Sequence, residues 1–204
     1  MIWNDSKISA WAASGGVTPF DESCVNPASL DLRLGNQIRE PHRCWSHMSE
    51  IDIRQHIERG DIDALPKWDE ARTFEVFWLY PKRFVLCHSL ELVRIPVTVA
   101  SILVLKSSWG RKGLNHSHSG WGDPGFGLPA TQSLQTTDGK NDGAHWTFEL
   151  QNISPWPIKL TASERVIQQI FFDMADAPVL DYRSTGHYVY QTGATVAFES
   201  ICTP

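Results

Sequence analysis

The sequence predicts a mostly β domain arranged as a sandwich or a barrel. Apolar and polar residues alternate with period two in several short stretches, which places the apolar side chains on one face of a strand. Residues 166–172 form an apolar run that only Gln168 and Gln169 interrupt, as is typical of a buried strand. Pro, Gly and Asn separate these stretches at the intervals common in sandwiches and barrels.

The size and composition of the chain favour one folded domain. The 204 residues are 42% hydrophobic and include nine tryptophans, which is enough for a substantial core. The formal net charge of −5 argues against broad nucleic-acid binding, although a few local Lys and Arg can still hold a small anionic ligand. We therefore expect a single domain over residues 1–204 that does not bind nucleic acid.

The location that the sequence predicts is cytoplasmic, without a membrane span. The first residues lack the basic and apolar regions of a signal peptide, and the most apolar segment, residues 93–105, is too short to cross a bilayer. The four cysteines lie far apart along the chain, which suits reduced thiols better than a disulfide framework.

The first element is predicted to be a short amphipathic helix. Asp5 is a suitable N-cap, and Ile8, Trp11 and Ala12 then fall on one helical face. Two consecutive glycines end the pattern, so the helix is expected over residues 5–14.

Strands are predicted along most of the remaining chain. Residues 29–35 alternate strictly and end at Gly35 and Asn36, which indicates a half-buried strand. The other predicted strands are the alternation of Phe74, Val76 and Trp78, residues 83–86, 90–95 and 97–105, the alternation of Trp146, Phe148 and Leu150, the pair Ile158 and Leu160, and residues 166–172. Residues 41–72 are polar, with a possible short helix at 50–59, and residues 127–144 have no period, which is typical of a long surface loop.

One polar segment has the composition of a phosphate-binding loop. Directly after an apolar strand come three cations, Lys106, Arg111 and Lys112, and two hydroxyls, Ser107 and Ser108, among glycines. Glycine lets backbone N–H groups approach an anion closely. The spacing is not that of a Walker P-loop. Taken alone, a solvated turn between two strands is the simpler interpretation.

Two carboxylates also stand out. Asp123 precedes Pro124 and Gly125, a pattern that usually marks a turn. Glu149 lies between two apolar residues, and if these face the core, its side chain points the other way and normally to solvent. If that face lined a closed site, the glutamate could instead pass protons between reacting groups. Without further evidence the structural role is the simpler interpretation for both.

Metal chemistry is only weakly indicated. His116 and His118 could share one face of a strand, but no third ligand stands at a useful spacing. The triplet His56-Ile57-Glu58 matches half of the zinc deaminase signature, and the cysteine pair of the other half is missing. We therefore predict no zinc and no protein-built metal site.

Taken in order along the chain, these signals resemble one known family. The chain resembles the dCTP deaminase family, whose members are close relatives of the trimeric dUTPases. The segments that resemble successive motifs of that family are residues 27–35, 106–114 (KSSWGRKGL), 123–126 (DPGF), 149–152 (ELQN) and 168–172 (QQIFF). Residues at about 180–204, with Tyr182, His187 and Gln191, resemble that family's C-terminal lid. The resemblance covers most of the chain apart from about 41–72 and 127–146, which are expected to be insertions.

The resemblance implies both a fold and an assembly. The fold would be a distorted β-barrel or jelly-roll of the dUTPase-like type with a short N-terminal helix. The chain would assemble as a homotrimer or a hexamer, with active sites between subunits.

The resemblance also implies a reaction, the deamination of dCTP or of a modified deoxycytidine triphosphate to dUTP and ammonia. Glu149 would activate the water that attacks C4 of cytosine, Ser107 would position that water, and Arg111 would hold the carboxylate. The substrate-binding residues that it implies are Lys106, Ser108, Asp123, Gln169, Tyr182, His187 and Gln191. Mg²⁺ would arrive on the triphosphate and not in a dedicated protein site.

The sequence departs from the family pattern near the expected triphosphate and base. Lys106 stands where an Arg is usual and lacks the guanidinium fork, and His187 replaces a usual Lys. Two alternatives to simple deamination therefore stay open. One is pyrophosphate release from dUTP or dCTP, alone or together with deamination, and the other is a nucleotide-binding regulator without catalysis.

Overall fold

The computed structural model describes residues 1–42, 68–117, 120–128, 143–180, 182–189 and 191–196. Most of the two predicted insertions, the candidate helix at 50–59 and the last residues of the predicted lid lie outside these described residues. Within them, the mostly β prediction is confirmed. None of the helices in this described part of the chain has the length and apolar character needed to cross a membrane.

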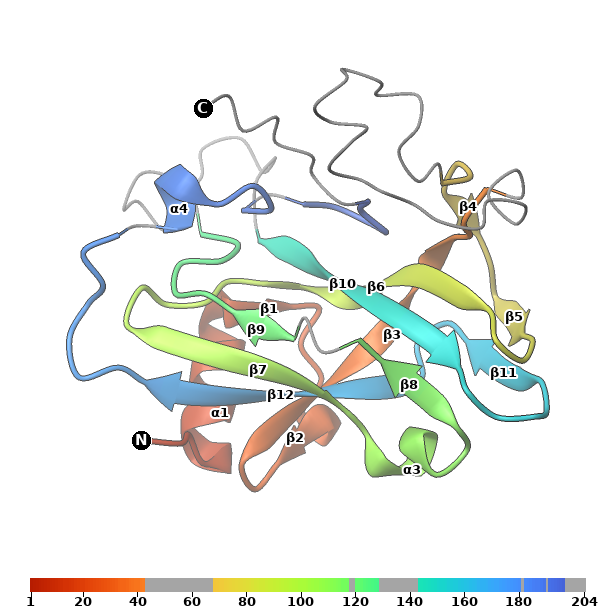
Figure 1. Ribbon diagram of the computed structural model, residues 1–204. Helices are drawn as coiled ribbons and strands as arrows, with labels where there is room; N and C mark the ends of the chain where they lie inside the picture. Colours follow the sequence, from red (N-terminus) through yellow and green to blue (C-terminus); the bar gives the residue numbers. More distant parts are fainter. Residues whose placement is uncertain (43–67, 118–119, 129–142, 181, 190, 197–204) are drawn as a thin grey trace, which may run out of the picture.

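One large antiparallel sheet dominates the described structure (Figure 1). Its main path runs in the order β8 (Leu114–His116), β10 (Ala144–Asn152), β6 (Phe84–Val93), β3 (Ser29–Arg39), β12 (Arg165–Asp173), β7 (Val99–Leu105) and β9 (Trp121–Gly122). Three short strands pair beside this path, namely β1 (Val17–Thr18), β2 (Val25–Asn26) and β4 (Arg72–Thr73). A separate two-stranded sheet joins β5 (Val76–Leu79) to β11 (Ile158–Thr161).

The sheet curls into a half-barrel that brings its two edges toward each other. The strands β8 and β9 lie at opposite ends of the path, yet residues 117–120 alone separate them along the chain. Four residues span about 14 Å at most, so the two edges cannot lie far apart. Ser117 donates its backbone N–H to Glu149 on β10, and the carbonyl of Gly120 accepts from Leu103 on β7. The expected distorted barrel is therefore present as a sheet that nearly closes on itself.

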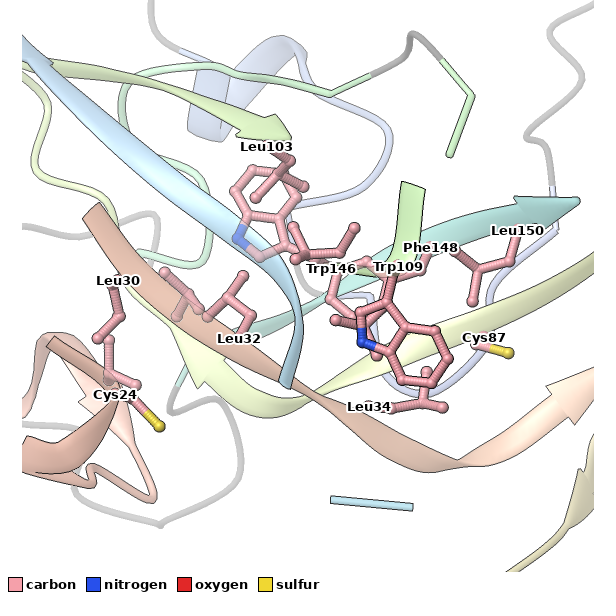
Figure 2. Close-up of a cluster of buried hydrophobic side chains, with 14 of the residues drawn as sticks. Cys24, Leu30, Leu32, Leu34, Cys87, Leu103, Trp109, Trp146, Phe148 and Leu150 are labelled. Carbon is pink, nitrogen blue, oxygen red and sulfur yellow. The ribbon is translucent and has the colours of Figure 1, made fainter. Parts of the chain in front are cut away.

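The core fills the inside of this curl (Figure 2). Leucines 30, 32 and 34 of β3 belong to the same buried cluster as Phe148 and Leu150 of β10, and all of these side chains are at most 1% exposed. Burial of such a side chain stabilises the fold by about 1.5–3 kcal/mol. One ion pair is buried beside these apolar contacts, between Glu91 on β6 and Arg33 on β3 (2.6 Å). The backbone N–H of Arg33 also donates to Glu91 (3.0 Å).

The N-terminal helix forms as predicted, with a different cap. Helix α1 spans Asp5–Trp11, and a wider turn, η1 (Ala12–Gly16), continues it to the two glycines. The N-cap is Asn4 and not Asp5, because the Asn4 side chain accepts from the N–H of Lys7 (3.0 Å). Ile8 and Ala12 are fully buried, as the helical periodicity requires.

Three strand predictions differ in detail from the structure. The strand that was expected to end at Gly35 continues as β3 to Arg39. Gly35 lies within this strand and does not end it, because the His88 ring packs against its backbone, where a Cβ would lie 2.2 Å from the ring. In β5 the alternation is real but the faces are reversed. Val76 and Trp78 are about half exposed, and Leu79 is buried. In addition, β6 is one strand through Phe84–Val93 where the sequence indicated two.

Candidate functional site

A cavity of about 420 Å³ lies between strands β6 and β10 on one side and residues of β7 and β9 on the other. Strands β6 and β10 form its floor, residues of β7, β9 and the following turn form one side, and the C-terminal segment lies across it. The residues that line it are Trp68, Phe84, Leu86, Leu103, Trp121, Phe126, Trp146, Thr147, Glu149, Tyr182, Tyr188, Gln191, Thr195 and Val196. The volume is within the range of small-molecule sites.

Glu149 reaches this cavity because of the alternation of β10. Along that strand every second side chain is buried, including Phe148 and Leu150, and the residues between them face the opposite side. That opposite side holds Thr147 and Glu149, which pair in register with His88 and Leu86 of β6. The face that sequence reasoning assigned to solvent is therefore the floor of the cavity.

Aromatic side chains form the wall next to this floor. Phe126 stacks on Trp146 with ring centroids 3.7 Å apart and planes at 5°. Trp121 donates from Nε1 to Asp123 (2.9 Å), so this carboxylate stands at the edge of the cavity without lining it. Burial and the nearby Asp123 carboxylate raise the pKa of Tyr182, which keeps the phenol protonated. Flat rings beside a few polar groups suit a planar, polar ligand such as a nucleobase.

Two buried polar atoms on the cavity wall have no hydrogen-bond partner among the described residues. They are Nε1 of Trp146 and Oγ1 of Thr147, and both side chains line the cavity. A buried polar group without a partner costs about 1–3 kcal/mol. Both atoms are out of contact with solvent, so the strand that carries Glu149 has two unmet hydrogen-bonding groups beside the cavity.

The cluster around Arg111 lies outside the cavity. Ser107 begins the short helix α3 (Ser107–Gly110), and Figure 1 shows α3 beside β8, far from α4 (Tyr182–Thr185). Ser107, Ser108 and Arg111 are exposed, and none of the predicted residues of this cluster lines the cavity. Lys106 bonds to the buried carboxylate of Asp31, so its charge is paired within the chain.

Two other predicted binding residues do not line the cavity either. Gln169 is fully buried and donates to the hydroxyl of Ser101 (3.0 Å), which places it in the interior between β12 and β7. His187 is exposed and follows α4. Of the ten predicted site residues, the structure thus brings three to the cavity, namely Glu149, Tyr182 and Gln191.

Sequence reasoning missed several cavity residues. Thr147 could have been found, because period two places it on the same face as Glu149. Trp121 and Phe126 reach the cavity only through the closure of the sheet, which no local pattern reveals. Among the described residues, no three His, Cys, Asp or Glu side chains gather as metal ligands would.

Comparison with known proteins gives a consistent result. The model of a family described as dCTP deaminase-like matches residues 2–174. A relative from Acidothermus cellulolyticus named dCTP deaminase, dUMP-forming, is 36% identical over 177 residues, which cover 84% of this chain and 80% of the relative. A relative of the same name from Streptomyces coelicolor is 35% identical over 207 residues, covering 97% of this chain and 94% of the relative.

A solved structure shares the fold. It is the crystal structure of 2′-deoxycytidine 5′-triphosphate deaminase from Agrobacterium tumefaciens, with a TM-score of 0.57 and 19% sequence identity over 83% of this chain. The match covers 47% of that protein, so this chain spans about half its length. At this identity the likeness concerns the fold alone.

Proposed function

The chain belongs to the dCTP deaminase-like family, and on that premise we propose that it removes the C4 amino group of dCTP by the attack of a water molecule. The observation that carries this proposal is Glu149, the carboxylate on the floor of an aromatic cavity that two residues of the predicted lid, Tyr182 and Gln191, also line. Its place after Ser107 and Arg111 along the chain matches the order of the family motifs.

The proposed chemistry needs one group that takes up and gives back a proton. Glu149 accepts a proton from water as the oxygen bonds to C4, and it then delivers that proton to the amino group that leaves as ammonia. One carboxylate suffices for both steps when both reacting atoms lie beside it. The balance is dCTP and water giving dUTP and ammonia, without zinc.

A second step is favoured by the names of the relatives, both of which form dUMP. In that step another water attacks the α-phosphorus, so that dUTP becomes dUMP and pyrophosphate. We propose this two-step sequence, with dUMP as the final product. Mg²⁺ bound to the triphosphate oxygens would neutralise charge during the second step.

The proposed active site takes residues from two subunits. Glu149 lines the cavity, but Ser107 and Arg111 are exposed on α3 and do not line it. A homotrimer in which α3 of one subunit meets the cavity of the next would bring the three together. Ser107 would then position the water, and Arg111 would hold the Glu149 carboxylate, with Ser108 directed to the phosphates.

A nucleotide panel that follows ammonia and pyrophosphate separately tests the proposal. The wild type is incubated with dCTP, 5-methyl-dCTP and dUTP, and the nucleotides are separated by ion-exchange chromatography. Ammonia with dUMP from dCTP supports both steps. Ammonia with dUTP alone supports deamination and removes the second step. Absence of ammonia from both cytosine nucleotides would overturn the proposal.

Variants on β10 then test the role of Glu149. Glu149→Gln should bind dCTP and release ammonia at a rate lower by about 10²–10⁴-fold, because the amide cannot take up the proton. The matched control is Gln151→Ala, which changes the same face of β10 two residues further on, outside the cavity lining. Undiminished ammonia release by Glu149→Gln contradicts the mechanism.

A further inference from the structure

The C-terminal segment that covers the cavity is held mainly by one histidine. Residues 191–196, called the strap below, supply Gln191, Thr195 and Val196 to the cavity lining. His145 at the start of β10 makes three hydrogen bonds with it. Its backbone N–H donates to the carbonyl of Gln191 (3.0 Å), and its own carbonyl accepts from Nε2 of Gln191 (2.7 Å). Its ring atom Nδ1 accepts from the N–H of Gly193 (2.9 Å).

The bond from the N–H of Gly193 to Nδ1 requires the His145 ring to be neutral. A backbone N–H can only donate, so Nδ1 must carry a free lone pair and the ring must be neutral, with its proton on Nε2. Burial, and secondarily the neighbouring His88, lower the pKa of His145 to about 4. The ring is therefore in the accepting form at neutral pH.

His88 on β6 is the second member of the pair. Its ring lies 4.7 Å from that of His145. Nδ1 of His88 faces the carbonyl of Ser89 (2.6 Å), and Nε2 accepts from the N–H of Gln37 (3.2 Å). Both contacts are satisfied by the neutral ring with its proton on Nδ1, and burial lowers the pKa of His88 as well. Two neutral rings can lie this close, whereas two charged rings would repel each other.

The strap continues from His145 across the sheet toward β3. Arg39 on β3 donates from Nε to the carbonyl of Ala194 (2.7 Å). Gly193 has a φ of +66°, which glycine adopts without strain. The side chains that face His145 are thus His88 from β6 and Gln191 from the strap, Arg39 reaches the strap at Ala194, and residues 191–196 carry no ionisable group.

The geometry points to the His88–His145 pair as a neutral latch that keeps the strap closed over the cavity. Docking requires the free lone pair on Nδ1 of His145. A second proton on the ring, bound at Nδ1, therefore releases Gly193 and opens the part of the wall that holds Gln191. His145 is a positioning residue in this arrangement, because it touches the strap and does not line the cavity. The latch itself does not depend on the identity of the substrate, while its effect on turnover rests on the proposed function.

The sign of the pH effect follows from the two states. In the docked state the pKa of His145 is about 4, and in the open state it returns toward the value of an exposed histidine, about 6.5. The open state therefore binds more protons between these values, and docking is complete above pH 6.5 and weakens as the pH falls toward 4. At pH 5 the docking equilibrium should fall by up to about 30-fold.

Hydrogen exchange at the Gly193 amide measures the latch directly in the full-length protein. His145→Asn keeps an oxygen acceptor near the position of Nδ1, whereas His145→Gln carries its polar group further out, near the position of Nε2. We expect exchange at neutral pH to be faster by about 3- to 12-fold in His145→Gln, the loss of one hydrogen bond, and unchanged within about twofold in His145→Asn. Thr192→Ala alters an exposed side chain of the same strap and is the control.

Two results would overturn the latch. One is a Gly193 amide in His145→Gln that exchanges as slowly as in the wild type. The other is wild-type protection, corrected for the intrinsic rate, that is the same at pH 5 and pH 7. His145→Asn should lose the excess pH dependence over this range, because its amide does not titrate.

Kinetics supply the link to function. In His145→Gln the KM for dCTP should rise with a smaller change in kcat at pH 7.5, since the strap must close before chemistry, and His145→Asn should restore the wild-type KM. If no variant and no wild-type protein turns over dCTP while the exchange pattern holds, the proposed function fails and the latch stands. If dCTP turnover is normal but the two variants exchange at the same rate, the latch fails and the proposed function stands.

Discussion

Two inactive variants should restore activity to each other if the active site lies between subunits. Glu149 lines the cavity, whereas Arg111 is exposed beside α3 and does not line it. In the proposed arrangement the two residues act on one nucleotide from different subunits. We predict that Glu149→Gln and Arg111→Ala, each inactive alone, form active mixed trimers.

The expected magnitude follows from the site geometry. In trimers assembled at random from equal amounts of the two variants, a site is complete when its cavity comes from an Arg111→Ala subunit and its α3 from a Glu149→Gln subunit. Each condition is met in half of the cases, so about one quarter of the sites should work. If both residues acted within one chain, every chain would carry one defect and no site would be complete.

The assay is ammonia release from dCTP by co-expressed subunits with tags of different mass, after native mass spectrometry has verified mixed trimers. The matched control mixes Ser107→Ala with Arg111→Ala. Both positions belong to the same turn around α3, so both must come from the same subunit and this mixture should stay inactive. The reasoning is refuted if verified mixed trimers of the first pair are inactive, or if the control pair recovers activity.

Three further predictions concern single side chains. Thr147→Val removes a buried hydroxyl without a partner among the described residues; the free energy of unfolding in urea should change by less than about 1 kcal/mol, while the KM for dCTP should rise. A large loss of stability would mean that the hydroxyl is bonded within the fold. Glu91→Gln removes the nearer of the two counter-charges of Arg33, which keeps only the contact with Asp21 at 3.5 Å. It should lower the free energy of unfolding by about 1.5–3 kcal/mol, and an unchanged free energy of unfolding would contradict this. Burial raises the pKa of the Cys87 thiol, so site-resolved mass spectrometry should find it unmodified by iodoacetamide at pH 8 in the folded protein and modified in urea.

The fold could be predicted largely because its strands carry strong local patterns. The alternation in β10 and the mainly apolar sequence of β12 are properties of a few adjacent residues, and both segments form strands with buried residues in the structure. The errors arose where distant partners decide. Ser89 and His88 look like a polar break in β6, yet the Ser89 hydroxyl bonds to the carbonyl of Glu91 and to the N–H of Trp146, so the strand continues.

The face of a strand that meets the core is equally a tertiary property. Period two states that Val76 and Trp78 share a face, but it does not state which face is inside. In β5 the partner strand β11 and the core select Leu79 instead. For the same reason the sequence alone assigned Glu149 to solvent, whereas the closure of the sheet turns that face into a cavity floor.

The predicted site residues also differ in whether the tertiary structure brings them to the cavity. Those that one chain brings together, Glu149, Tyr182 and Gln191, lie on or beside β10 and the segment docked on it. The other seven were identified by motif order, which records the chemistry of each residue but not its place in space. Four of them lie around α3, and Asp123, Gln169 and His187 lie elsewhere. No pattern along a single chain distinguishes a neighbour within the fold from a neighbour across an interface.

The floor and the cover of the cavity are held by different forces, and this difference determines which of them opens. Phe148 and Leu150 anchor β10 in the core on either side of Glu149, and removal of such a side chain costs about 3–5 kcal/mol. The strap has hydrogen bonds to His145 and Arg39, each with a net value of about 1 kcal/mol. The strap is thus the weaker element, and we expect it to open while the carboxylate stays fixed. If the cavity binds the nucleotide as proposed, His145 controls that opening from outside the cavity lining.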